Sequence, residues 1–327
     1  MERMRPVFKG LTALLAAGLI AIPAGAEIDD KNAAPTATEV VQGNRDLSAR
    51  LTVPVMIEGA GPYQFVVDTG AERTVLSREL AERLTLRPTS PVTLLSIAGL
   101  NQVDTALVPG LRLTSARSRM AAFEAPLLSE QHLGAVGMLG IDSLQNKRVI
   151  LDFRAMRLSI SDAPRPTKAE TDEIVVTARR RLGQLILVDA EAEDQKVYVI
   201  VDTGSAVSIG NPALRRRLAQ RGRLGAVVPI SITSVTGRET PADYGAVRSI
   251  RIGSVTLKNM PIAFADAQVF HRLGLDDRPS LLLGMDALRL FDRVSIDFAN
   301  RNVRFLMPGD AWQVPAPVLA GAIPHNG

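Results

Sequence analysis

The strongest constraint in this chain is an internal repeat. Residues 51–70, LTVPVMIEGAGPYQFVVDTG, align without gaps on residues 185–204, LILVDAEAEDQKVYVIVDTG. Each copy has an alternating apolar run, a turn that contains Gly or Asp, and a second apolar run that ends in Asp-Thr-Gly, which is the pattern of paired strands. A repeat of this length predicts two similar lobes built from strands.

The repeat continues beyond the Asp-Thr-Gly triplets. SIAG at 96–99 matches SVTG at 234–237. The two halves then close in the same way, with MLGIDSLQNKRVILDFRAMRLSI at 138–160 and LLGMDALRLFDRVSIDFANRNVRF at 282–305. A single triplet can arise by chance, but two triplets in matched contexts indicate a duplicated structural unit.

The composition supports strands and narrows the classes of function. Apolar residues make up 46% of the chain and aromatic residues only 4%, so Val, Ile, Leu and Ala must form the core, which favours strands. The formal net charge of +4 is too small to indicate a nucleic-acid or membrane partner. There is no cysteine, the three histidines are scattered, and no zinc-protease or serine-hydrolase motif occurs. We therefore expect no metal and no organic cofactor.

The first 26 residues have the features of a secretory signal peptide. Basic residues precede the apolar run LTALLAAGLIAI at 11–22, and Ala24-Gly25-Ala26 offers a cleavage site. The run is shorter than the ~20 residues needed to cross a bilayer. We expect a periplasmic or secreted protein with no stable membrane span after residues 1–26 are removed.

The rest of the chain divides by composition into lobes and polar connections. EIVVTARRR at 173–181 resembles the energy-coupling box of outer-membrane receptors, but no barrel sequence follows it, and a first strand of the second half is the favoured interpretation. We expect a flexible linker at 27–46, an N-terminal lobe at 47–162, an inter-lobe linker at 163–183, a C-terminal lobe at 184–308 and a tail at 309–327.

The duplication also predicts a pair of carboxyl groups. Two homologous halves pack most simply about a pseudo-twofold axis, where a residue meets its counterpart from the other half. If Asp68 and Asp202 lie at that axis, their carboxyl groups approach to ~3 Å and share one proton. Such a pair suits amide hydrolysis, because the ionised member can take a proton from water while the protonated member hydrogen-bonds the scissile carbonyl.

The residues that follow each aspartate fit such a site. Gly70 and Gly204 would let the backbone turn sharply so that its N–H groups face the carboxylates. Thr69 and Thr203 have hydroxyl groups able to reach the opposite loop and lock the two halves together.

These motifs resemble those of the aspartic peptidases, specifically the retropepsin-like branch. The resemblance rests on Asp-Thr-Gly-Ala at 68–71 and on apolar-apolar-Gly triplets at 138–140 and 282–284. It implies an all-β fold of two retropepsin-like β-barrel lobes with short helices, arranged as in pepsin with a cleft at the pseudo-twofold axis. It also implies Asp68 and Asp202 as the catalytic pair, in a monomer that needs no cofactor.

The family further implies two flaps, which are hairpins that close over a peptide substrate. By position these are LLSIAGLNQ at 94–102 and ITSVTGRET at 232–240, with Gly99 and Gly237 at their tips. Neither flap has the tyrosine of pepsin flaps, which fits retropepsins.

The two catalytic loops differ at one position. Ser205 follows the second triplet, whereas Ala71 follows the first. The Ser205 hydroxyl is expected to hydrogen-bond Asp202 and to favour its ionised form.

The sequence therefore predicts an exported aspartic endopeptidase that cuts extended polypeptide segments. Two alternatives remain open at this point. The chain could be a peptide-binding or scaffold module that keeps the fold without turnover, or it could pair with a second chain to build two sites.

Overall fold

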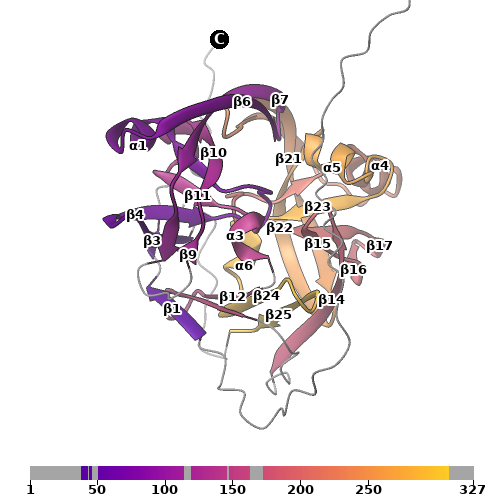
Figure 1. Ribbon diagram of the computed structural model, residues 1–327. Helices are drawn as coiled ribbons and strands as arrows, with labels where there is room; N and C mark the ends of the chain where they lie inside the picture. The colour runs from indigo at the N-terminus through magenta and orange to yellow at the C-terminus, as the bar shows by residue number, and fades with distance from the viewer. Residues whose placement is uncertain are drawn as a thin grey trace, which may run out of the picture. The chain divides into compact units, whose positions relative to one another are not determined.

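The computed structural model describes residues 38–42, 44–45, 51–113, 119–145, 147–162 and 172–308. Within these residues strands dominate and all helices are short. The predicted all-β fold with two lobes is confirmed (Figure 1). The predicted signal peptide at 1–26 and the tail at 309–327 lie outside the described residues.

The N-terminal lobe follows two short strands, β1 (Thr38–Gln42) and β2 (Asn44–Arg45). Its elements are β3 (Leu51–Ile57), β4 (Ala60–Val67), β5 (Val75–Ser77), α1 (Arg78–Arg83), β6 (Arg87–Ser96), β7 (Gly99–Val108), β8 (Leu111–Leu113), β9 (Arg119–Met120), β10 (Phe123–Leu128), α2 (Glu130–Leu133), β11 (Gly137–Leu139), α3 (Ile141–Leu144), β12 (Lys147–Asp152) and β13 (Arg157–Asp162).

The second half also has three short helices, with one strand between its second and third helix and two strands after the third, as in the first half. Its elements are β14 (Glu173–Arg181), β15 (Gln184–Leu187), β16 (Ala190–Ala192), β17 (Gln195–Lys196), β18 (Tyr198–Val201), β19 (Ile209–Gly210), α4 (Pro212–Gln220), β20 (Val227–Thr233), β21 (Glu239–Ile252), β22 (Val255–Ala265), α5 (Gln268–Arg272), β23 (Ser280–Leu283), α6 (Met285–Leu288), β24 (Arg293–Asp297) and β25 (Asn302–Leu306).

The two lobes share the strand pairing that holds their Asp-Thr-Gly loops. In the first lobe, β11 pairs in parallel with β4 and antiparallel with β5. In the second lobe, β23 pairs in parallel with β18 and antiparallel with β19. Each loop leaves the parallel neighbour, and its aspartate N–H donates to the last residue of the central strand: Asp68 to Leu139 at 2.9 Å and Asp202 to Leu283 at 3.0 Å.

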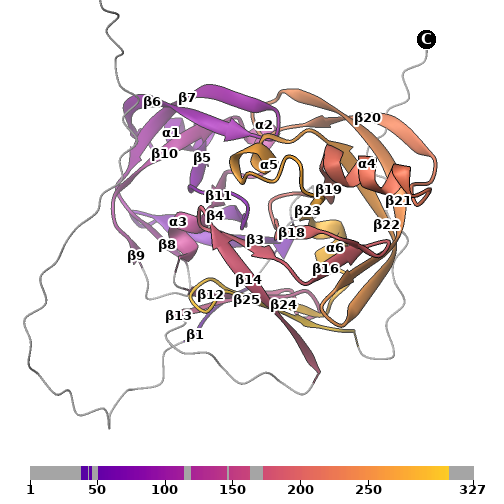
Figure 2. The same ribbon diagram turned by 90° about the vertical axis from the view of Figure 1, so that its right-hand side faces the viewer.

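A sheet shared by the two halves joins them, in the order β1, β13, β12, β24, β25 and β14 (Figure 2). Its central pair, β12 and β24, comes from opposite lobes. The Arg148 guanidinium donates to Asp297 Oδ2 across this pair at 2.7 and 3.1 Å, and the Asp297 side chain is fully buried. The register also places Asp152 opposite Arg293, so the repeat-related residues face each other in reverse order, as a pseudo-twofold axis requires.

Strands of this sheet include residues from both predicted linkers. Residues 38–42 of the linker expected at 27–46 form β1, and residues 173–181 of the linker expected at 163–183 form β14. Pairing of β14 with β25 and burial of Val176 and Ala178 on its inner face explain why this polar segment becomes a strand. The energy-coupling interpretation of 173–181 therefore has no structural support. None of the helices in the described part of the chain is long and apolar enough to cross a membrane.

Candidate active site

Each aspartate of the Asp-Thr-Gly triplets is held by the backbone of its own loop. The N–H groups of Gly70 and Ala71 donate to Asp68 Oδ1 at 2.7 and 2.9 Å. In the second lobe, the N–H groups of Gly204 and Ser205 donate to Asp202 Oδ1 at 3.0 and 3.2 Å. The loops therefore present an inward-facing carboxyl group with one oxygen occupied by backbone donors.

The two threonines lock these loops together. The Thr69 hydroxyl donates to the Val201 carbonyl at 2.9 Å, and the Thr203 hydroxyl donates to the Val67 carbonyl at 2.6 Å. Each hydroxyl also accepts from the other threonine's backbone N–H, at 3.1 and 3.2 Å. Four buried hydrogen bonds thus cross between the lobes directly beneath the aspartates, as the sequence predicted for Thr69 and Thr203.

The structure brings the two carboxyl groups together. Asp202 hydrogen-bonds the Asp68 side chain, and its pKa is raised well above the ordinary value of 3.8. Desolvation is the main cause, followed by the charge of Asp68, while the N–H groups of Gly204 and Ser205 oppose the shift. One proton is therefore retained by the pair where two isolated carboxyl groups would both ionise.

The loop glycines are required because each opposes the other lobe's aspartate. A Cβ atom at Gly70 would lie 2.7 Å from the Asp202 carboxyl carbon, and one at Gly204 would overlap the Asp68 carboxyl group. Neither glycine has a positive φ. Close approach, rather than the sharp turn expected from the sequence, is therefore the reason for glycine at these positions.

A second carboxylate in each lobe anchors the end of the catalytic loop. Asp142 accepts from the Thr74 hydroxyl at 2.7 Å and from its N–H at 2.9 Å. Asp286 accepts from the Ser208 hydroxyl at 2.7 Å and from its N–H at 3.0 Å. Burial raises the pKa of Asp286. These carboxylates brace the loops within their own lobes and do not form a second pair.

The predicted role of the Ser205 hydroxyl is wrong. Its Oγ donates to the Val207 carbonyl at 2.7 Å, and Ser205 contacts Asp202 through its backbone N–H. A backbone carbonyl two residues away is within reach of the serine rotamer, and that local bond satisfies the hydroxyl. The loop nevertheless supports Asp202 through the Ser205 N–H.

The two predicted flaps are hairpins whose tips meet. Gly99 has φ 116° at the start of β7, and Gly237 has φ 77° in the turn between β20 and β21. The Ser96 hydroxyl lies 3.4 Å from the Thr236 hydroxyl, and Asn101 Nδ2 donates to Thr236 Oγ1 at 3.3 Å. Both hairpins lie on the same side of the described structure (Figure 2).

Each flap tip also rests on the opposite lobe. Ile97 packs against an apolar cluster of the second lobe that includes Ile200 and Phe270, and its carbonyl accepts from the Gln268 N–H of α5 at 3.3 Å. Val235 packs against a first-lobe cluster that includes Val66. Each hairpin tip therefore contacts both the other tip and the opposite lobe.

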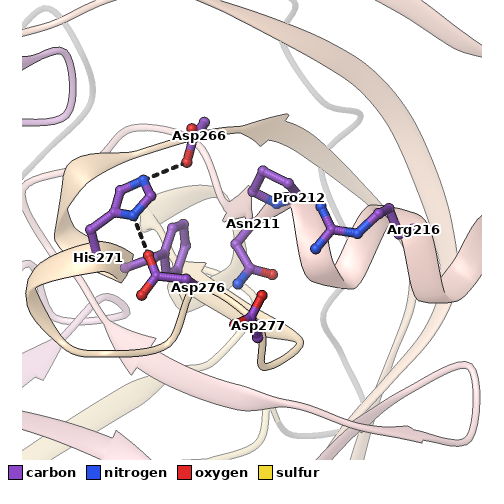
Figure 3. A pocket seen from close by; sticks show the side chains of 8 residues that line it. Asn211, Pro212, Arg216, Asp266, His271, Asp276 and Asp277 are labelled. Atoms are coloured by element: carbon purple, nitrogen blue, oxygen red, sulfur yellow. Dashed lines mark hydrogen bonds and ion pairs between the residues drawn. The ribbon is translucent and has the colours of Figure 1, made fainter.

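The segment around α5, which contacts the first flap tip through Gln268, is held by side-chain contacts of its own. A cavity of about 200 Å³ between the start of α4 and the segment around α5 is lined by Asn211, Pro212, Arg216, Asp266, Phe270, His271, Asp276 and Asp277 (Figure 3). His271 Nε2 bonds Asp266 at 2.7 Å, and its Nδ1 contacts Asp276 (Figure 3). These contacts hold the turn around α5 in place.

Two cross-lobe contacts near the catalytic loops were not predicted. Gln184 Nε2 donates to the Gly70 carbonyl at 2.6 Å. Arg272 of α5 makes two bonds of 2.7 Å to the Glu72 carboxylate, from a position 200 residues away. The first half has Arg50 at the position that corresponds to Gln184, and the second half has Ala206 at the position that corresponds to Glu72. The repeat therefore gives no signal for either contact.

Comparison with known families agrees with this geometry. A family model described as aspartyl protease matches residues 53–143 and 188–287, more than half of the chain. The chain belongs to the retropepsin-like aspartyl protease family and carries two copies of its domain. A comparison with curated proteins gave no match. Membership supports a protease function in general, with a peptide substrate.

Within the described ranges, no group of three or more His, Asp or Glu side chains is arranged to hold a metal ion. Backbone N–H groups of both loops donate to the aspartate pair, and the two threonine hydroxyls bond backbone carbonyls of the opposite lobe. The two carboxyl groups can give protons to, and take protons from, a molecule bound between them.

Proposed function

We propose that this protein is an exported aspartic endopeptidase in which Asp68 and Asp202 activate a water molecule for attack on a peptide bond. The observation that carries the proposal is the hydrogen bond between these two carboxyl groups, contributed by separate lobes of one chain and linked to a raised pKa of Asp202. Two acids that share one proton supply a general base and a general acid in the same place.

The reaction balances without any added group. The ionised carboxylate takes a proton from water as the water oxygen bonds the carbonyl carbon, and the protonated carboxyl gives its proton to the carbonyl oxygen. The tetrahedral gem-diol then breaks its C–N bond as the leaving nitrogen takes the proton held by the pair, and one gem-diol hydroxyl gives its own proton to the other carboxylate as it becomes the carbonyl of the new carboxylic acid. The pair again holds one proton, which its two carboxyl groups share.

An extended polypeptide is the proposed substrate. A strand-like segment can add its backbone hydrogen bonds between the flaps and the floor of the site. Because the flap tips bond each other through Ser96, Asn101 and Thr236, they must separate before a chain can enter. The fully intramolecular site supports a monomer as the active species.

The proposed location is the periplasm or the medium, on the basis of the signal-like residues 1–26. Fractionation of cells that express the whole chain tests this. Recovery only in the cytoplasm with residues 1–26 intact would contradict it.

Activity is tested with the purified chain from residue 27, incubated with a peptide library and casein between pH 3 and 7. We expect internal cleavage, inhibition by a statine-type transition-state mimic, and a loss of about 10³-fold or more in Asp68→Asn and Asp202→Asn, since general acid–base chemistry typically supplies 10²–10⁴-fold. Asp104→Asn, which changes an exposed carboxylate, is the control. Binding of library peptides without cleavage at any pH would instead support the scaffold alternative.

A further inference from the structure

Gln184 is a buried side chain of the second lobe that reaches the catalytic loop of the first. It begins β15 and is only 4% exposed. Its Nε2 donates to the Gly70 carbonyl at 2.6 Å. The orientation of the amide is set by chemistry, because a carbonyl oxygen can bond only to the NH₂ end.

The Gly70 carbonyl belongs to the same peptide group as the Ala71 N–H. That N–H donates to Asp68 Oδ1 at 2.9 Å. A peptide group that accepts a hydrogen bond at its oxygen is polarised and donates more strongly at its nitrogen. Gln184 can therefore act on Asp68 through one peptide group, without touching either carboxyl group.

The second loop holds its aspartate less closely. The backbone bonds to Asp202 are 3.0 and 3.2 Å long, against 2.7 and 2.9 Å at Asp68. The Ser205 hydroxyl does not add a bond to Asp202, because it donates to the Val207 carbonyl. Desolvation and the charge of Asp68 raise the pKa of Asp202. The raised pKa means that the pair keeps a proton, and the shorter backbone bonds at Asp68 favour the negative charge there and the proton on Asp202.

We propose that Gln184 is a positioning residue that holds the Gly70–Ala71 peptide so that its N–H stabilises negative charge on Asp68. In the free enzyme Asp68 is then the ionised member of the pair and Asp202 the protonated one. The charge assignment stands on its own, and the roles that follow rest on the proposed function. Asp68 takes the proton from the attacking water, and Asp202 gives its proton to the scissile carbonyl oxygen.

Two substitutions at this position separate the hydrogen bond from packing. Gln184→Met keeps the length of the side chain and removes the donor. We expect the acid limb of the kcat/KM profile to move to higher pH by about half a unit to one unit, kcat to fall about tenfold and KM to change less than about twofold. Gln184→Glu restores a donor only while its carboxyl group is protonated, so its activity should approach that of the wild type at the acid end.

Ser280→Ala is the matched control. The Ser280 hydroxyl is buried and donates to the Arg278 carbonyl at 2.8 Å, away from the aspartates. Loss of this bond should lower Tm without moving the pH profile. If Gln184→Met only lowers Tm in the same way and keeps the wild-type profile, the positioning role is overturned.

A readout without turnover separates this inference from the proposed function. Carbon-13 NMR of labelled aspartate carboxyl groups, in wild type and in Gln184→Met, follows the pH at which the pair loses its first proton. A shift to higher pH in the variant supports the inference even if no peptide is cleaved by the wild type, an outcome that would defeat only the proposed function. Identical titrations in the two proteins, with peptide cleavage intact, would defeat only the role of Gln184.

Discussion

Gly70 lies so close to Asp202 that a Cβ atom on the glycine would stand 2.7 Å from the aspartate's carboxyl carbon. The reciprocal approach of Gly204 to Asp68 is closer still. Each lobe thus leaves an empty space at its own glycine, and the acid of the other lobe fills that space. The separation of the two carboxyl groups is set by this mutual fit.

Alanine at these glycines should therefore disable the site. We expect Gly70→Ala and Gly204→Ala to lower kcat/KM by at least about 10²-fold, because a displacement of 1 Å at reacting groups can have an effect of that size. Gly225→Ala is the control, since a Cβ at Gly225 meets nothing within 4 Å and its φ is not positive. Peptide cleavage assays decide the matter: wild-type activity in Gly70→Ala would show that the carboxyl groups need not approach so closely.

Replacement of the Asp202 carboxyl group by a neutral amide should stabilise the protein at neutral pH but not at acid pH. The pKa of Asp202 is raised by desolvation first and by the charge of Asp68 second. A raised pKa in the folded state means that the acid's contribution to stability is full below its ordinary value of 3.8 and declines as pH rises through the folded-state pKa.

Asp202→Asn should accordingly match the wild type in Tm near pH 3 and exceed it at pH 7. Thermal unfolding at both values measures the difference. Asp104→Asn, which changes an exposed carboxylate, should follow the wild-type curve. A variant Asp202→Asn that is less stable than wild type at pH 7 would contradict the assigned pKa direction.

The threonine bonds should matter for stability as well as for alignment. Thr203→Val leaves the Val67 carbonyl and the Thr69 N–H without their bonds to the hydroxyl. Each buried group left unpaired costs about 1–3 kcal/mol, so we expect the free energy of unfolding to fall by about 2–4 kcal/mol in urea titrations. Thr203→Ser keeps the hydroxyl and should lose much less. Wild-type stability in Thr203→Val would contradict the role of these bonds, because valine keeps the methyl group and lacks only the hydroxyl.

The flap-tip contact offers a reversible test of substrate entry. The chain has no cysteine, and the Ser96 and Thr236 hydroxyl oxygens lie 3.4 Å apart, so Ser96→Cys with Thr236→Cys places two thiols within reach of a disulfide. We expect the oxidised double variant to lose cleavage of peptides and to regain it on reduction. The single variants serve as controls under both conditions. Full activity with the disulfide formed would show that substrate enters without separation of the tips.

Much of the fold and the central pair of the site could be predicted from the sequence. Duplication places Asp68 and Asp202 in equivalent loops, and packing of equivalent lobes about an axis brings equivalent residues together. The hydroxyl bonds of Thr69 and Thr203 and the flap hairpins tipped by Gly99 and Gly237 follow from the same symmetry. The strands themselves follow from local alternation of apolar residues.

The tertiary structure alone decided what breaks that symmetry. Gln184 reaches Gly70, and Arg272 reaches Glu72, through the packing of one lobe on the other, and no local pattern records such contacts. The Ser205 hydroxyl donates to the Val207 carbonyl, and the folded loop decides that partner. Segments 38–42 and 173–181 became strands because partner edges from β13 and β25 were available to them. The alternation of apolar residues is a local property of the chain, whereas these choices depend on which groups the folded lobes bring within bonding distance.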